Sequence, residues 1–148
     1  MQIELNDIGH IIQLSVAPVF LLTGVGTTLT VLTNRLARIV DRSRILEDKF
    51  RKEEDEAHAG DYRDELITLY SRSHLINRAI VLATACALMI SLVIISLFVG
   101  DALNIDLSKY IAAFFVLAMV SLLASFSYLL REIFLATQTM RTVVRLPK

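Results

Sequence analysis

The sequence predicts an all-α integral membrane protein with three transmembrane helices and a cytoplasmic helical hairpin between the first and the second. Three stretches contain no Asp, Glu, Lys or Arg, namely Ile8–Asn34, Ala79–Gly100 and Tyr110–Leu130. Each is near or above the roughly 20 residues that an α-helix needs to cross a hydrocarbon core of ~30 Å. The mean hydropathy of the chain is +0.59. Three buried helices of a soluble bundle are the alternative, but soluble helices of this length normally keep a polar face.

The first predicted span covers residues 8–33 and carries a proline inside it. Pro18 removes one backbone hydrogen bond and is expected to kink the helix, which neighbouring helices can compensate in a membrane. Glu4 and Asp7 precede the span, and no basic residue does. Because a signal peptide needs a positively charged start and a shorter apolar region, we expect this span to be a retained helix.

The polar segment 34–78 sets the predicted orientation. It holds ten of the fifteen Lys and Arg residues, whereas Lys109 alone lies between the second span and the third. Basic residues concentrate on the cytoplasmic side of a membrane. The sequence therefore predicts a multi-pass protein of the inner (plasma) membrane with its N-terminus outside, the polar segment in the cytoplasm and the C-terminus in the cytoplasm.

Helical spacing of apolar residues within 34–78 predicts two antiparallel arms. The second arm is predicted to run from an N-cap at Asp61 to Arg78, and a first arm of matching length ends near Lys52. The acidic stretch Glu53–Gly60 is then the solvated tip. The second and third spans cover 79–100 and 110–130, and a short outer loop joins them. The third helix is expected to continue into a cytoplasmic tail, 131–148, that ends at Pro147. We treat 1–148 as one membrane domain.

Small residues recur every four positions on the second span and predict close helix packing. Such a stripe lets membrane helices approach each other, within one subunit or between subunits. The stripe consists of Ala79, Ala83, Ala87 and Ser91.

A polar line follows the inner half of the first span. It consists of Thr23, Thr27, Thr30 and Asn34. Hydroxyls and amides that face water can line a conduction path, so these residues are candidate pore-lining residues. The alternative is packing between helices, since a membrane threonine can also bond its own backbone four residues back. In the pore interpretation, Glu4 and Asp7 form an acidic outer mouth.

A third set of polar residues lies where the three helices cross the cytoplasmic boundary of the membrane. One interpretation is that these residues form a layer that fixes the hairpin to the membrane domain. The other is that the arginines extend independently to lipid phosphates. The set is Asn34, Arg35, Arg38, Asp41, Asn77, Arg78, Arg131 and Glu132.

Catalytic and cofactor chemistry has no support in the sequence. Cys86 is the single cysteine and lies in an apolar run, and the three histidines lack metal-ligand spacing. The formal net charge of zero argues against nucleic-acid binding driven by bulk charge. We therefore expect no enzyme activity, no metal, no cofactor and no nucleic-acid partner.

The run PVFLLTGVGTTLTVLTNRLARIVDRSRILE and the later LINRAI resemble a family of bacterial membrane proteins known as the domain of unknown function 2721 family. Its specific part is Leu32–Arg42, and the resemblance extends from the first span to the third. It implies a small integral membrane protein without an assigned activity.

Two functions remain open from the sequence. Three helices leave little room for a path inside one subunit, so the first is a homo-oligomeric channel lined by the first helix. Its selectivity is open because an acidic mouth favours cations and Arg35 and Arg38 oppose them. The second is a structural or adaptor protein whose hairpin binds a cytoplasmic partner, which predicts exposed apolar residues such as Phe50 or Tyr62.

Overall fold

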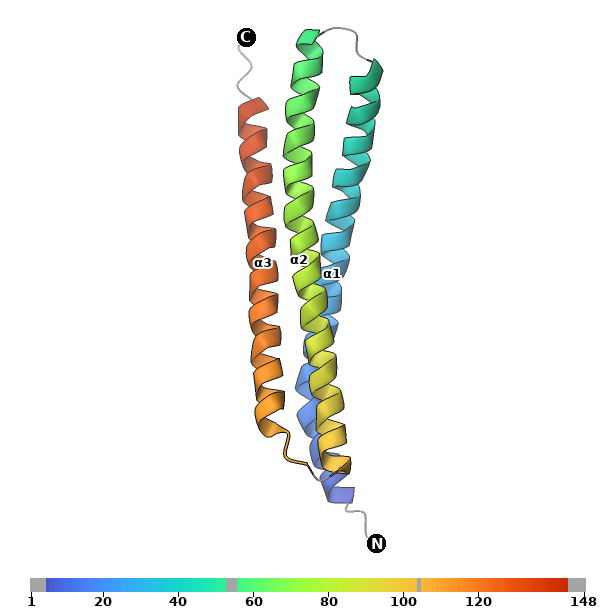
Figure 1. The fold of residues 1–148 in the computed structure, drawn as a ribbon, viewed down its shortest axis with the longest axis vertical. Helices are drawn as coiled ribbons and strands as arrows, with labels where there is room; N and C mark the ends of the chain where they lie inside the picture. Colours follow the sequence, from blue (N-terminus) through green and yellow to red (C-terminus); the bar gives the residue numbers. More distant parts are fainter. Residues whose placement is uncertain (1–4, 53–55, 104, 144–148) are drawn as a thin grey trace. The chain divides into compact units, whose positions relative to one another are not determined.

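The computed structural model describes residues 5–52, 56–103 and 105–143. Side chains are described for residues 9–52, 60, 62–103 and 105–137. The described chain forms three helices, α1 Leu5–Lys52, α2 Glu56–Ala102 and α3 Ser108–Val143 (Figure 1). All three are long and apolar enough to cross a membrane, which confirms the all-α, three-span prediction.

The helix ends refine two sequence predictions. α1 continues through Pro18 and ends at Lys52, where the first arm was expected to end. α2 begins at Glu56, so Asp61 lies inside the helix and the N-cap prediction was wrong. Gly60 is compatible with this extension, because one glycine inside a helix costs only about 1 kcal/mol relative to alanine. Pro147 and residues 53–55 of the expected tip lie outside the described residues.

The chain divides into two compact units, and each helix contributes to both. The first unit contains the described residues of Met1–Leu29 and of Leu82–Ala124. We name it the apolar unit. The second contains the described residues of Thr30–Val81 and of Ser125–Lys148, and we name it the charged unit.

The apolar unit has a narrow core of small and branched side chains. On α2 this core recurs at Ala83, Cys86, Ile90 and Val93, with the alternating spacing of three and four residues that keeps one face of a helix against its neighbours. Large apolar side chains cover the outside, including Phe20 at 74% exposure. Only 17–22% of the most apolar window of each helix is buried. Such exposed apolar surface fits a lipid environment better than water.

A hydroxyl of the apolar unit links two helices. Ser121 Oγ on α3 donates a hydrogen bond of 2.8 Å to the carbonyl oxygen of Leu82 on α2. Ser91 Oγ instead donates to the carbonyl of Ala87 on its own helix, at 2.9 Å. Polar bonds between membrane helices contribute about 0.6 kcal/mol on average. They therefore orient the helices more than they stabilise them.

The connection from α2 to α3 depends on one glycine and one aspartate. A Cβ atom at Gly100 would lie 3.2 Å from the carbonyl oxygen of Ile105, so a larger residue would push the returning chain away. Asp106 Oδ1 accepts hydrogen bonds from the backbone N–H and the hydroxyl of Ser108, at 3.1 and 2.6 Å. These bonds stabilise the carboxylate and lower the pKa of Asp106. They also satisfy an N–H at the start of α3.

The charged unit packs the antiparallel arms of α1 and α2 against α3. Its apolar core repeats every seven residues, at Leu32, Ile39 and Leu46 on α1 and at Leu69 and Ile76 on α2. A seven-residue repeat keeps a continuous seam between helices. On α3, Ser125 Oγ donates a buried hydrogen bond of 2.7 Å to the carbonyl oxygen of Ala79.

Two polar contacts join the α1 and α2 arms at the surface of the charged unit. Arg42 donates from Nε and Nη2 to Glu65 Oε1, at 3.0 and 2.8 Å. The Tyr70 hydroxyl donates to a carboxylate oxygen of Glu47. Both contacts are solvent-exposed, and exposed ion pairs typically contribute about 0–1 kcal/mol. The buried seam therefore carries most of the association between the arms.

Candidate functional site

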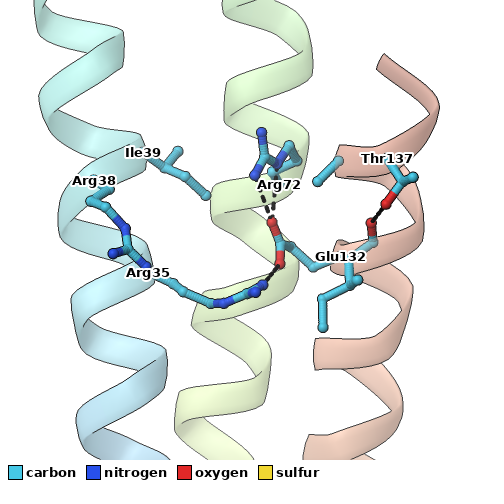
Figure 2. A pocket seen from close by; sticks show the side chains of 8 residues that line it. Arg35, Arg38, Ile39, Arg72, Glu132 and Thr137 are labelled. Carbon is cyan, nitrogen blue, oxygen red and sulfur yellow. Dashed lines mark hydrogen bonds and ion pairs between the residues drawn. The ribbon is translucent and has the colours of Figure 1, made fainter. Parts of the chain in front are cut away.

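The one fully buried carboxylate among the described residues is Glu132 on α3, which is 1% exposed. Arginines from both other helices hold it (Figure 2). Arg72 on α2 donates from Nε and Nη2 to Oε1, at 3.0 and 2.9 Å. Arg35 on α1 donates from Nη1 to Oε2, at 2.6 Å. Both carboxylate oxygens are therefore bonded to a guanidinium.

Helical spacing explains why these side chains converge. Glu132 lies seven residues after the buried Ser125, and Arg72 lies seven residues before the buried Ala79. Residues seven apart share a face of a helix that follows a coiled-coil repeat. Glu132 and Arg72 thus occupy positions that elsewhere in the charged unit hold small core residues. Arg35 flanks the α1 seam, three residues after Leu32.

The three charged side chains of the cluster differ in how much of their surface stays in contact with water. The arginine side chains keep 34% (Arg35) and 25% (Arg72) of their surface exposed, whereas Glu132 keeps 1%. Removing an ion from water costs several kcal/mol, and only close partners and hydrogen bonds recover that cost. Glu132 depends on the arginines, while each arginine can retain part of its hydration.

A pocket of about 340 Å³ opens beside this ion cluster. Arg35, Arg38, Arg72 and Glu132 supply its charges, and apolar side chains together with a threonine supply the rest of its wall, namely Ile39, Ile133, Ala136 and Thr137. Arg38 lies one turn beyond Arg35 on α1 (Figure 2). It is exposed and has no carboxylate partner among the described residues. The pocket therefore carries a net charge of +2.

The structure brings together only part of the polar set expected at the membrane boundary. Arg35 and Glu132 are in direct contact, and Arg38 lines the same pocket. The other members are exposed and are not part of the pocket: Asn34, Asp41, Asn77, Arg78 and Arg131. Of the predicted layer, the structure therefore brings Arg35 and Glu132 into direct contact and places Arg38 beside them.

Sequence reasoning missed Arg72 as a member of this cluster. It was counted among the basic residues of the hairpin and not among the boundary residues, because it lies well before the apolar run of α2. The signal that identifies it is its seven-residue spacing from Ala79 and, beyond that, from Cys86. The four-residue spacing of the small-residue stripe does not include position 72.

The candidate pore-lining residues are all exposed. Thr23 and Thr27 lie in the apolar unit, and Thr30 and Asn34 lie in the charged unit. Thr23 Oγ1 donates to the carbonyl of Val19 at 3.3 Å, and Thr27 Oγ1 donates to the carbonyl of Thr23 at 3.1 Å. Of the candidate outer mouth, Glu4 and the side chain of Asp7 lie outside the described residues.

The small-residue stripe of α2 faces the chain's own core at one end. Ala79 and Ala83 are fully buried, and Ala87 and Ser91 are half-buried. The Ala79 backbone carbonyl also accepts the hydrogen bond from Ser125. In each unit, the buried part of the stripe therefore takes part in packing within the subunit.

Within the residues searched, no group of three or more His, Cys, Asp or Glu side chains could hold a metal ion. The charged cluster is rich in donors instead, since guanidinium groups donate hydrogen bonds and accept none. Its chemistry suits the recognition of an anion.

The fold and this site define a class of helical protein in which three membrane-length helices share one buried ion cluster. The chain belongs to the family described as "Protein of unknown function (DUF2721)", whose model matches residues 15–142. No curated protein and no solved structure shows significant similarity to the chain.

The buried ion cluster predicts an asymmetric response to mutation. Glu132→Ala leaves two partly exposed guanidinium groups facing each other without a counter-charge, so it should cost less than the roughly 3–5 kcal/mol of breaking a fully buried ion pair. The triple variant R35M/R72M/E132L removes all three charges, so it should recover most of that loss. Thermal unfolding followed by circular dichroism in detergent suits a chain that lacks tryptophan. A triple variant as unstable as E132A would contradict this explanation.

Proposed function

We propose that the protein is a homo-oligomeric integral membrane protein that forms an ion-conducting pore lined by α1. The single observation that carries the proposal is the exposure of polar side chains on α1, on the face turned away from the subunit's own core. Thr23, Thr27, Thr30 and Asn34 are all exposed. A pore at the axis of an oligomer would bring this exposed polar face into contact with water.

The helical geometry supports this placement in each unit separately. Two residues along a helix turn a side chain by about 200°, which is close to the opposite face. In the apolar unit, Thr23 and Thr27 lie two residues on either side of Val25, which is 1% exposed. In the charged unit, Thr30 and Asn34 lie two residues on either side of Leu32, which is fully buried.

The hydrogen bonds of the threonines bear on the alternative explanation. Because Thr23 and Thr27 donate to carbonyls of α1, their hydroxyl hydrogens need no partner outside the helix. Each hydroxyl oxygen keeps acceptor capacity, which water or a cation in a pore can use. Both side chains are also exposed in the subunit, which favours water or a neighbouring subunit over packing against the subunit's own helices.

The proposed orientation places the charged unit in the cytoplasm of a bacterium and the α2–α3 connection outside. The unequal distribution of basic residues supports it. The inner end of the proposed pore then carries Arg35 and Arg38. Arg35 shares the carboxylate of Glu132 with Arg72, and Arg38 has no carboxylate partner among the described residues.

A membrane-anchored adaptor is the second candidate. Its specific support is apolar surface on the charged unit, where Ile45, Phe50 and Ile67 are 52%, 42% and 55% exposed. Tyr62 is half-buried. Apolar side chains on a unit that extends from the membrane suit a cytoplasmic protein partner.

The orientation predicts which cysteines an impermeant maleimide reaches. In a Cys86→Ala background, L103C at the α2–α3 connection should be labelled in intact cells after opening of the outer membrane. K49C near the end of α1 should be labelled only after the inner membrane is permeabilised. Both native side chains are exposed, so a difference between them reports the side of the membrane. The reverse pattern would contradict the orientation.

The pore predicts both proximity and conductance. In the same background, T27C should form a disulfide-linked dimer on oxidation, whereas V116C, an exposed position on α3, should not. In liposomes, T23V/T27V should lower ion flux by roughly tenfold, equivalent to about 1.4 kcal/mol. T28V is the matched control, because Thr28 is half-buried and also bonds its own helix, through the Gly24 carbonyl.

Wild-type protein that is monomeric, or that conducts no ion under any gradient, would contradict the pore and leave the adaptor as the function to pursue. Equal loss of flux in T28V and T23V/T27V would show that the polar face has no special role. Cation and anion gradients applied to the wild type assign the selectivity.

A further inference from the structure

We infer that the pocket beside Glu132 binds a phosphate group. The pocket lies within the charged unit, and the ion-pair description alone does not account for its excess of positive charge. Three arginines and one carboxylate line the pocket, and both oxygens of that carboxylate are already bonded to Arg35 and Arg72. Among the described residues, no further carboxylate lines the pocket to balance the remaining positive charge.

Arg38 gives the clearest indication that the pocket can take an anion. It shares a face of α1 with Arg35, three residues away, and like charges at this spacing repel. Glu132 bonds Arg35 and Arg72 but not Arg38. A second anion in the pocket would pair with Arg38 and relieve that repulsion.

Phosphate fits the donors better than a halide does, and it has more oxygens than a carboxylate with which to reach several arginines. A guanidinium presents parallel N–H groups that match two oxygens of a phosphate. Arg72 uses Nε and Nη2 on Glu132, Arg35 uses Nη1, and Arg38 uses none of its donors there. Donors from separate arginines therefore remain for an anion with several oxygens.

The size and wall of the pocket limit the ligand. A volume of about 340 Å³ lies at the lower end of the roughly 300–1,000 Å³ typical of ligand sites. Ile39, Ile133 and Ala136 form an apolar side. The pocket thus suits a ligand in which the phosphate is attached to a small group and an apolar part lies next to that group.

The position along the chain brings this pocket near lipid headgroups. Arg35 is the first charged residue after the apolar run of α1, and Glu132 is preceded only by Arg131 after that of α3. Phosphates of anionic lipids attract basic residues at this depth. A lipid headgroup and a soluble phosphate share the same chemistry, so the experiment separates these two sources.

The test measures thermal stabilisation of the full chain in detergent. Wild type is titrated with phosphatidylglycerol in mixed micelles, with phosphatidylcholine as the zwitterionic background, and separately with inorganic phosphate. Arg38→Gln is the test variant, because Arg38 forms no ion pair with the described residues whose loss would destabilise the fold. Arg78→Gln is the matched control, since Arg78 is also exposed at the membrane boundary but does not line the pocket.

We expect phosphatidylglycerol to raise the melting temperature of wild type and R78Q. R38Q should need at least roughly tenfold more lipid for the same shift, because it loses charge-assisted hydrogen bonds. A shift with inorganic phosphate that R38Q also weakens would support the pocket and assign a soluble source. No shift with either probe, or equal weakening in R38Q and R78Q, would overturn the inference.

Discussion

The burial of one carboxylate constrains the charged unit more than any other contact. Glu132 lies on the core face of α3, and its two oxygens can be satisfied only if Arg35 and Arg72 reach it from two other helices. An isolated carboxylate in such a place would cost several kcal/mol, so helix arrangements that separate the three residues are strongly disfavoured. Apolar contacts alone would allow one helix to slide along its neighbour by one turn. The same movement would break the contact of Glu132 with its arginines.

The two units differ in how their helices are held together. In the apolar unit, small and branched side chains form the core, and Ser121 donates a hydrogen bond to the carbonyl of Leu82. In the charged unit, core residues repeat every seven positions, and Arg72 and Glu132 occupy two positions of such repeats. A polar pair in an apolar seam specifies the register of the helices. The cluster also leaves Arg38 uncompensated, and this excess charge is the basis of the phosphate inference.

The sequence was sufficient for the architecture because that depends on strong local signals. Long uncharged runs predict the three helices, and α1 ends at Lys52 as predicted, although the arm of α2 begins earlier than the matching length assumed. The predicted N-cap at Asp61 was wrong because it rested on the local sequence alone. The helix begins earlier, at Glu56, and includes Gly60. Arg35, Arg38 and Glu132 could be grouped by their place along the chain. Arg72 could not, since its role depends on which face of α2 meets α3.

Exchange of charge between two helices tests the central interaction most directly. E132R and R72E should each lower the melting temperature strongly, because each places like charges side by side in a buried site. The double variant E132R/R72E restores opposite charges across the same contact, so it should be clearly more stable than either single variant. The coupling between residues in contact is expected to be about 0.5–3 kcal/mol. A double variant as unstable as the sum of the two single changes would contradict the account.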